Sequence, residues 1–302
     1  MGGARVPSVR MRALELFSGI GGFAAAVADR VDVVGAVDHD LVSQQIYALN
    51  WAHPRFVKNL ASVRDPWLAA FNADLWWMSP PCAPHGIRGQ QRDVDDPRSA
   101  ALRRLTRAFE VIGPDHVAME NVPWFFGSRA WDELLLAWER AGYAHVEHGE
   151  ICPTALGWPS QRRRFYAVAS RRPLRRSAAS PTPVRLSDCL LPWDEALAAS
   201  PALLERFGDA LHVVDADDPG AIAATFTRAY GNSPVYVGSY LRQGGRIRLF
   251  HPKEIAALHG LPAGFDFGAV SLRDGWRRVG NSVSVPVVRH VVGWIPEFGD
   301  AR

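Results

Sequence analysis

The first 170 residues alternate short apolar runs with longer segments in which apolar residues recur at helical spacing. The short runs are bounded by Gly, Asp or Pro and predict buried strands at residues 13–17, 33–37, 74–79, 116–120 and 164–170. The helical spacing falls near residues 22–30, 40–50, 98–112 and 129–141. This alternation predicts an α/β fold, a doubly wound and mostly parallel sheet whose ligands bind at the carboxyl ends of the strands.

The alternation stops after Pro173, where a stretch rich in Pro, Ser and Asp begins. We therefore expect residues 173–270 to form a second, smaller domain that starts from a linker. The closing run SVPVVRHVVGWI is apolar and helix-like, with Pro286 near its start, where proline is tolerated. We expect residues 271–302 to pack back on residues 1–172 and complete the larger domain.

Length and composition narrow the class of protein. A chain of 302 residues with 48% hydrophobic and 22% charged residues can bury a full core, so it is neither a disordered tail nor a fibre. It has no run of apolar residues long enough to cross a membrane and no secretory signal. We expect a monomer in the cytoplasm, in a bacterial cytoplasm or nucleoid, without a membrane partner.

The cysteine pattern argues against a fold held together by disulfides or by a structural metal. The chain has three, Cys82, Cys152 and Cys189, and no C-x-x-C pair. An odd set without paired spacing is typical of neither a disulfide framework nor a structural zinc site, so we expect no metal.

The net charge of +3 is too small to identify a partner, but the arginines are unevenly distributed. Seven fall between residues 162 and 176. A second group follows at Arg242, Arg246, Arg248, Arg277 and Arg278. Such clusters suit phosphate, because a guanidinium can donate paired hydrogen bonds to its oxygens. An arginine-rich solvated surface is the alternative.

The stretch ELFSGIGGF, residues 15–23, is the first candidate site. An apolar strand ends there in a Gly-rich turn that opens a helix, so the backbone can approach a ligand closely. An acidic residue about 20 positions later can hold ribose hydroxyls, and Asp38 stands at the end of the next predicted strand. The pattern favours an adenosine-containing cofactor over a tight turn without a ligand.

Cys82 follows the predicted strand at 74–79 and two prolines, Pro80 and Pro81. Proline fixes φ and removes a donor, so these residues would hold the thiol in one direction at the edge of the sheet. Nearby cations can favour the thiolate and make it a nucleophile. A buried structural thiol is the alternative, because free cysteines are often buried.

Possible partners of this thiol stand at other strand ends. Glu120 closes the apolar run at 116–120, where partial burial would raise its pKa and let it share a proton. Arg162 and Arg164 are two residues apart, so they point to one side of a strand while Arg163 points to the other. Each alone could be an ordinary ion-pair residue.

In this order the motifs resemble those of the cytosine-5 methyltransferases that use S-adenosylmethionine. FSGIGG is similar to the family's cofactor loop, SPPC to its nucleophile motif, ENV to its glutamate motif, RRR in SQRRRFY to its arginine motif, and VGNSVSVPVV to its C-terminal motif. HPKEIAALHGLPAGF resembles the block before that last motif. The resemblance implies the class I S-adenosylmethionine-dependent methyltransferase fold, which is Rossmann-like, and a small target-recognition domain over residues 173–270.

The resemblance also implies a mechanism. Cys82 would add to carbon 6 of a cytosine flipped out of its helix, and carbon 5 would then accept the methyl group. Glu120 would hydrogen-bond the ring, while Arg162 and Arg164 would position the base and phosphate. Loss of the carbon 5 proton would expel the sulfur.

Further sites follow from the same resemblance. The implied cofactor-binding residues are Phe17, Ser18, Gly19, Ile20, Gly21, Gly22, Asp38, Pro80, Asn281, Ser282 and Val283. The expected nucleic-acid-binding residues are His85, Arg88, Arg228, Arg242 and Arg246.

The sequence leaves more than one hypothesis for the nucleic acid that the protein acts on. Membership of the family at large favours DNA, which we take as the first substrate. The loop after Cys82 and the stretch TFTRAYG are closest in pattern to the subfamily that methylates aspartate tRNA, so a cytosine of a tRNA anticodon loop is the alternative. Ala83, His85 and Gly86 depart from the usual family loop, and a non-catalytic nucleic-acid-binding homologue is a further alternative.

Overall fold

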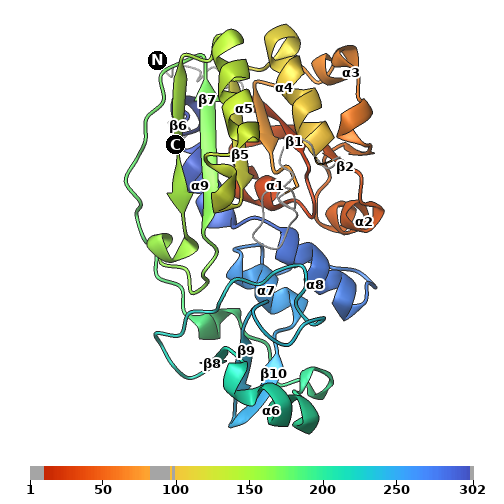
Figure 1. Ribbon diagram of the computed structural model, residues 1–302, viewed down its shortest axis with the longest axis vertical. Coiled ribbons are helices and arrows are strands. Elements are labelled where there is room, and N and C mark those ends of the chain that lie inside the picture. The colour runs from red at the N-terminus through yellow and green to blue at the C-terminus, as the bar shows by residue number, and fades with distance from the viewer. Residues whose placement is uncertain (1–9, 82–95, 97–98, 300–302) are drawn as a thin grey trace, which may run out of the picture.

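A seven-stranded sheet with helices on both faces forms the main body of the protein (Figure 1). The computed structural model describes residues 10–81, 96 and 99–299. The strand order is β3-β2-β1-β4-β5-β7-β6, and β7 runs antiparallel to both of its neighbours. The strands are β1 (Met11–Leu16), β2 (Val31–Asp38), β3 (Arg55–Val57), β4 (Leu75–Met78), β5 (His116–Asn121), β6 (His145–Ile151) and β7 (Arg164–Ser170). The predicted α/β class and mostly parallel sheet are confirmed.

Alternating side chains divide the sheet into two packed faces. Trp76 and Trp77 are neighbours in β4 and point to opposite sides, as the two-residue period of a strand requires. Trp77 stacks on Phe23 with ring centroids 5.3 Å apart, and Trp76 contacts Phe109 at 5.8 Å. The helices around the sheet are α1 (Gly22–Val27), α2 (Leu41–Asn50), α3 (Asp65–Ala69), α4 (Ala100–Ile112), α5 (Arg129–Arg140), α9 (Val285–Val292) and α10 (Pro296–Gly299).

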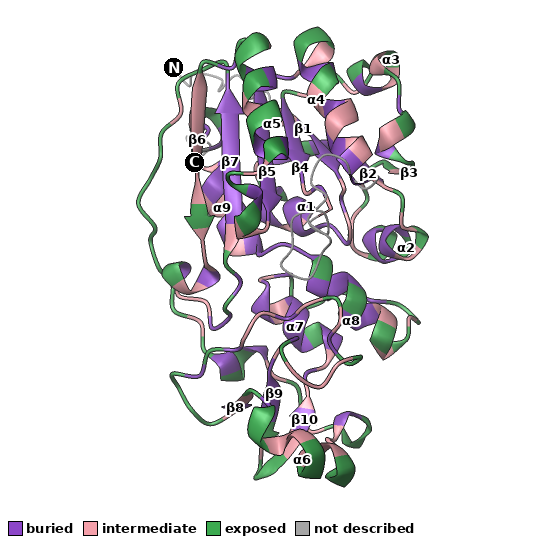
Figure 2. Cartoon of the chain, viewed as in Figure 1, coloured by how far each residue is buried: buried purple, intermediate pink, exposed green. Residues whose placement is uncertain are grey.

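A smaller three-stranded sheet, order β10-β9-β8, lies below the main body in Figure 1. Its strands and the helices near it are β8 (Val213–Asp215), β9 (Tyr240–Gln243), β10 (Arg246–Leu249), α6 (Pro201–Phe207), α7 (Pro252–Leu258) and α8 (Leu272–Asn281). Figure 2 shows α6 exposed at the outer end and β7 buried inside the main body. One buried cluster runs through both parts, so they share a core. The division at residues 173 and 270 stays a prediction.

Elements at the sheet edges were missed by sequence analysis for a physical reason. β3 is three residues long and mostly exposed, and β6 reads HVEHGEI, a half-buried strand without an apolar run. An edge strand is covered less than a central one, so its composition is more polar. α3 is a single short turn of five residues.

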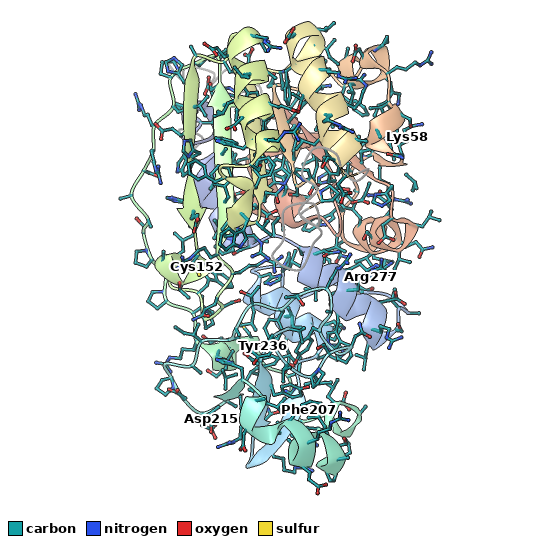
Figure 3. The ribbon with its side chains drawn as sticks, viewed as in Figure 1. Lys58, Cys152, Phe207, Asp215, Tyr236 and Arg277 are labelled. Carbon is teal, nitrogen blue, oxygen red and sulfur yellow. The ribbon has the colours of Figure 1, made fainter. Side chains whose placement is uncertain are left out.

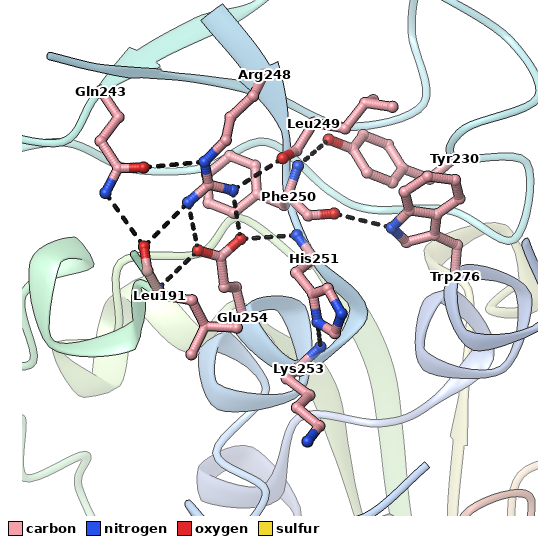
Figure 4. A network of polar contacts seen from close by, with 10 residues as sticks. All are labelled: Leu191, Tyr230, Gln243, Arg248, Leu249, Phe250, His251, Lys253, Glu254 and Trp276. Carbon is pink, nitrogen blue, oxygen red and sulfur yellow. Dashed lines mark hydrogen bonds and ion pairs between the residues drawn. The ribbon is translucent and has the colours of Figure 1, made fainter. Parts of the chain in front are cut away.

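An arginine–glutamate pair buried beneath the small sheet joins it to α7 (Figure 4). Arg248 donates to both carboxylate oxygens of Glu254, at 2.7 and 2.8 Å, and the two side chains are 1% and 0% exposed. Arg248 Nε donates to Gln243 Oε1 at 2.9 Å and its Nη2 to the Leu191 carbonyl at 3.2 Å. Arg248 therefore does not belong to an exposed phosphate-binding cluster.

A buried carboxyl supports the turn after β1. Glu15 is 1% exposed, and the backbone N–H groups of Phe23 and Ala24 donate hydrogen bonds to it. The Tyr47 hydroxyl lies 3.0 Å from Glu15 Oε2 and 3.0 Å from His53 Nδ1. Burial raises the pKa of the Glu15 carboxyl from its usual 4.5 to about 8, because water is excluded from the charged form.

Replacing Glu254 by Ala should destabilise the protein strongly, because Arg248 would keep its charge in the interior without its carboxylate. We expect a loss of about 3 to 5 kcal/mol in the free energy of unfolding. Glu195→Ala is the matched control, because it breaks an ion pair between two exposed side chains, Glu195 (77% exposed) and Arg246 (60% exposed). This change should lower the free energy of unfolding by about 0 to 1 kcal/mol. Urea unfolding measures both, and equal losses would contradict the assignment.

Glu15→Gln should remove a pH dependence of stability. The folded protein keeps a proton on Glu15 up to pH about 8, whereas the unfolded chain releases it above its usual pKa of 4.5. The contribution of Glu15 to the free energy of unfolding is therefore fully present below pH 4.5 and is lost as the pH rises towards 8. The neutral glutamine should match the wild type near pH 5 and exceed it near pH 8. Unfolding midpoints across this range that run parallel for the two proteins would refute the buried, protonated carboxyl.

Candidate active site

The turn from β1 into α1 has a backbone that requires glycine. Gly21 caps α1 with φ at 89°. A Cβ there would lie 2.1 Å from Trp51 Nε1, whose N–H donates to the Ile20 carbonyl at 3.3 Å. Any side chain at Gly21 would displace the indole that holds the turn. Phe17, at the start of the turn, also has a positive φ of 58°.

Asp38, at the end of β2, fixes the turn from the other side. Its Oδ2 accepts from the Gly19 N–H and its Oδ1 from the Asp40 N–H, both at 2.9 Å. Ser18 is held from the same strand and from α2, because its N–H donates to the Val37 carbonyl at 3.0 Å and its hydroxyl accepts from Gln44 at 2.8 Å. The predicted acidic residue therefore faces the Gly-rich loop.

A cavity of about 190 Å³ opens beside this turn. Phe17 and Asp38, two of the predicted cofactor-binding residues, line it. Its full lining is Phe17, Asp38, His39, Lys58, Asn59, Leu60, Ala61, Pro81 and Ala101. Sequence analysis missed His39, Lys58 and Asn59. The signal that could have found Lys58 and Asn59 is that they directly follow β3, the edge strand that was also missed.

The C-terminal motif lies against the start of α1. A Cβ on Gly22 would lie 2.6 Å from Val283 Cγ2 and 3.1 Å from Ser282 Oγ, so only glycine allows this approach. Asn281 is exposed at the last position of α8. The structure thus brings Ser282 and Val283 to the Gly-rich loop, 260 residues away along the chain.

Arg162 secures this arrangement from within. Its side chain is buried, and its guanidinium donates to the carbonyls of Phe226 at 3.0 Å, Gly280 at 3.1 Å and Ser282. These contacts join the segment before β7 to the small part of the protein and to the C-terminal motif. Because these three contacts are with main-chain oxygens of the protein, they give Arg162 a positioning role; the predicted contact with substrate stays a prediction.

Glu120 and Arg164 meet at the end of β5 and the start of β7. Arg164 Nε lies 3.2 Å from Glu120 Oε1, and the side chains are only 16% and 11% exposed. Burial raises the pKa of Glu120, and the positive charges of Arg164 and Arg162 partly oppose that rise. A raised pKa favours the protonated carboxyl, which can donate a hydrogen bond. Arg163 turns outward, with its guanidinium 3.8 Å from Glu150.

Cys82, His85 and Arg88 lie outside the described residues. The structure describes the segment that leads to them. Ser79 donates to the Leu16 carbonyl at 3.4 Å, and Asn121 Nδ2 donates to the Pro80 carbonyl at 3.4 Å. The end of β4 is therefore fixed between the β1 turn and the residue after Glu120.

The two described cysteines have structural surroundings. Cys152 Sγ accepts from the Arg162 N–H at 3.4 Å. Cys189 is buried, and burial raises the pKa of its thiol to about 11. A thiol with a raised pKa is a poor nucleophile, because little thiolate forms near neutral pH.

The predicted nucleic-acid-binding arginines fall in two places. Arg228 is exposed beside the end of α8, since a Cβ on Gly280 would lie 2.7 Å from its backbone nitrogen. The exposed Arg277 lies on the same helix (Figure 3). Arg242 and Arg246 lie on the small sheet, and Arg246 is 3.9 Å from the Trp193 ring. Arg278 is buried, and its guanidinium pairs with Asp40 and Asp274.

Residues 10–81, 96 and 99–299 contain neither a membrane-spanning helix nor a cluster of metal ligands. None of the helices there is both long enough and apolar enough to cross a membrane. The same residues contain no cluster of His, Cys, Asp and Glu that could hold a metal ion.

Comparison with known proteins agrees with the geometry. A tRNA (cytosine(38)-C(5))-methyltransferase of Schizosaccharomyces pombe is 27% identical, covering 95% of this chain and 97% of its own length. The type II methyltransferase M.HhaI of Haemophilus parahaemolyticus is 24% identical and covers 93% of each chain. The solved structure of the Entamoeba histolytica methyltransferase EhMeth shares the fold, with a TM-score of 0.89, 24% identity and coverage of 97% and 99%.

The family described as C-5 cytosine-specific DNA methylase matches residues 11–198 and 216–297. These ranges include the Gly-rich turn, the Glu120–Arg164 pair, the Arg162 contacts and the C-terminal motif. Most of the chain is therefore matched, and the protein belongs to the family of C-5 cytosine-specific DNA methylases, the cytosine-5 methyltransferases.

Proposed function

We propose that this protein methylates carbon 5 of a cytosine in transfer RNA, with S-adenosylmethionine as the methyl donor. The observation that supports the chemistry most directly is the buried Glu120–Arg164 pair, 3.2 Å apart, next to the segment that leads to Cys82. Members of the family use S-adenosylmethionine. The predicted order of substrates, DNA before transfer RNA, is reversed here because of the relatives.

The residues of the chain supply a nucleophile and a polar clamp. The thiolate of Cys82 forms a bond to carbon 6 of the cytosine, and the ring electrons that it displaces make carbon 5 nucleophilic. Glu120, whose pKa burial raises, hydrogen-bonds ring nitrogen 3 and the amino group of the adduct. The Arg164 guanidinium holds Glu120 in place. After the methyl group has been transferred, loss of the carbon 5 proton returns the electrons to the ring and breaks the carbon–sulfur bond.

The cavity beside the Gly-rich turn has the chemistry that an adenosine group requires. Phe17 offers an aromatic ring for the purine, and the Asp38 carboxylate can accept hydrogen bonds from ribose hydroxyls. Ser282 and Val283 close the turn from the C-terminal side. Bound here, S-adenosylmethionine would supply an electrophilic methyl group on a sulfonium.

Transfer RNA is favoured because the Schizosaccharomyces pombe relative, named for a tRNA cytosine, matches this chain over nearly the full length of both. The region from 173 to 270, which we propose as the target-recognition domain, is also small for reading base edges in the major groove of DNA. DNA is the second candidate, and the likeness to M.HhaI over 93% of both chains favours it.

Covalent trapping tests the chemistry and the polymer together. The wild type should form a denaturant-resistant adduct with a 5-fluorocytosine tRNA anticodon stem-loop when S-adenosylmethionine is present. Fluorine cannot leave as the carbon 5 proton does, so the carbon–sulfur bond persists. Cys82→Ala should form none, and Cys189→Ala, which changes a buried thiol elsewhere, should still form it. An adduct with Cys82→Ala would refute the nucleophile, and an adduct formed only with the matching DNA duplex would refute the RNA substrate.

Asp38→Ala should weaken the binding of S-adenosylmethionine, because it removes the carboxylate that faces the cavity and holds the Gly19 N–H. The loss of one charged hydrogen-bond partner predicts about a 10- to 100-fold rise in the dissociation constant. Asp29→Ala removes an exposed carboxylate that pairs with Arg289 and should leave the constant unchanged. Isothermal titration calorimetry measures both; equal affinities for the two variants would argue against a cofactor in this cavity.

A further inference from the structure

We propose that Trp124 is a platform on which an unpaired nucleobase next to the target cytosine stacks. The inference rests on the proposed function and extends it to a residue that the family motifs do not include. It starts from an exposed indole at the rim of the site: the Trp124 side chain is 62% exposed, four residues after Glu120.

The backbone places Trp124 at the edge of the sheet where the chemistry is proposed. β5 ends at Asn121, whose amide donates to the Pro80 carbonyl at 3.4 Å. The next residues form the single turn Pro123–Phe125. Trp124 therefore lies four residues after Glu120 and three after the amide that anchors the segment leading to Cys82.

The turn is held rigidly by the residue that follows Trp124. Phe125 is fully buried, and its ring lies 6.1 Å from that of Trp131 and 6.2 Å from that of Phe165. Its N–H donates to the Val122 carbonyl at 3.0 Å. Phe125 is buried whereas Trp124 is exposed, so the turn directs the two side chains apart. A ring presented by a fixed backbone loses little freedom when a ligand stacks on it.

The neighbouring aromatic residue differs in a way that singles out Trp124. Phe126 is 53% exposed, but its ring packs against Trp131, His148 and Phe165, with centroids 5.4 to 6.2 Å away. Within the described part of the chain, the Trp124 indole stacks on no other ring. Its apolar surface is thus open to a flat partner.

The partner that fits is a base of a single-stranded loop. Removing a cytosine from its stack leaves the adjacent bases without a neighbour, and proteins hold such bases on aromatic rings. A cation for the phosphates is available directly before β7: the Phe125 ring lies 6.2 Å from that of Phe165, and Arg163, two residues before Phe165, is 72% exposed, with its guanidinium 3.8 Å from Glu150. Exposed apolar residues on the outer faces of α4 and α5, Val111 and Leu136, lack this position beside the site.

The test uses the full-length chain carrying Cys82→Ala, which can bind but not react. A tRNA anticodon stem-loop with 2-aminopurine beside the target cytosine reports stacking by loss of fluorescence. Trp124→Ala should restore that fluorescence and raise the dissociation constant by about 5- to 150-fold, the range of one base–aromatic stack. Trp124→Phe should keep most of both effects because it retains a ring.

Leu136→Ala is the matched control, an exposed apolar residue on α5 that is 49% exposed. It should leave fluorescence and affinity unchanged. If Trp124→Ala binds the RNA as tightly as the parent protein, the proposed stacking on Trp124 is refuted. It is also refuted if the change alters self-association, measured by sedimentation, and leaves RNA binding unchanged. Failure of the wild-type protein to form the 5-fluorocytosine adduct would overturn the proposed function instead, so the two failures are distinct.

Discussion

The buried guanidinium of Arg162 is the interaction on which the arrangement of the site depends. It joins three segments that are far apart in the sequence, by donating to Phe226, Gly280 and Ser282. A buried guanidinium is costly unless its N–H groups find acceptors, and the three carbonyls accept from its Nη1 and Nη2, so they and the cation fix one another. The Ser282–Val283 segment can then rest on Gly22. In this way one side chain holds the Gly-rich turn, the segment around Phe226 and the start of β7 in a single geometry.

The same guanidinium sets the electrostatics of the interior. Burial raises the pKa of Glu120, and the charges of Arg164 and Arg162 act against that rise. His259, buried at the end of α7, responds in the opposite direction: burial and the two guanidiniums hold its pKa well below its usual value, and it stays neutral. Arg162 and Arg164 thus act on both a carboxyl and an imidazole in this part of the interior.

Sequence patterns predicted what is local and missed what joins distant residues. β1, β2, β4, β5 and β7 are buried strands, and a buried strand must be apolar. That is why the strand ends carrying Asp38 and Glu120 could be predicted. The partners of Arg162 lie 64 to 120 residues away, and their contacts are with carbonyl oxygens that every residue has. Such contacts leave no trace in residue type, so they could not be predicted from the sequence; the predicted contact of Arg162 with substrate stays a prediction.

The residues that would perform the chemistry and those that would choose the substrate differ in their surroundings. Glu120 and Arg164 are enclosed by the sheet, where small displacements are resisted by dense packing. Trp124, Arg163 and Arg228 stand on exposed turns and loops around them, where a side chain can change without disturbing the core. An enzyme built this way can keep one reaction while its rim adapts to another polymer. The choice between RNA and DNA should therefore depend on the exposed residues around the site, since the buried residues are compatible with both polymers.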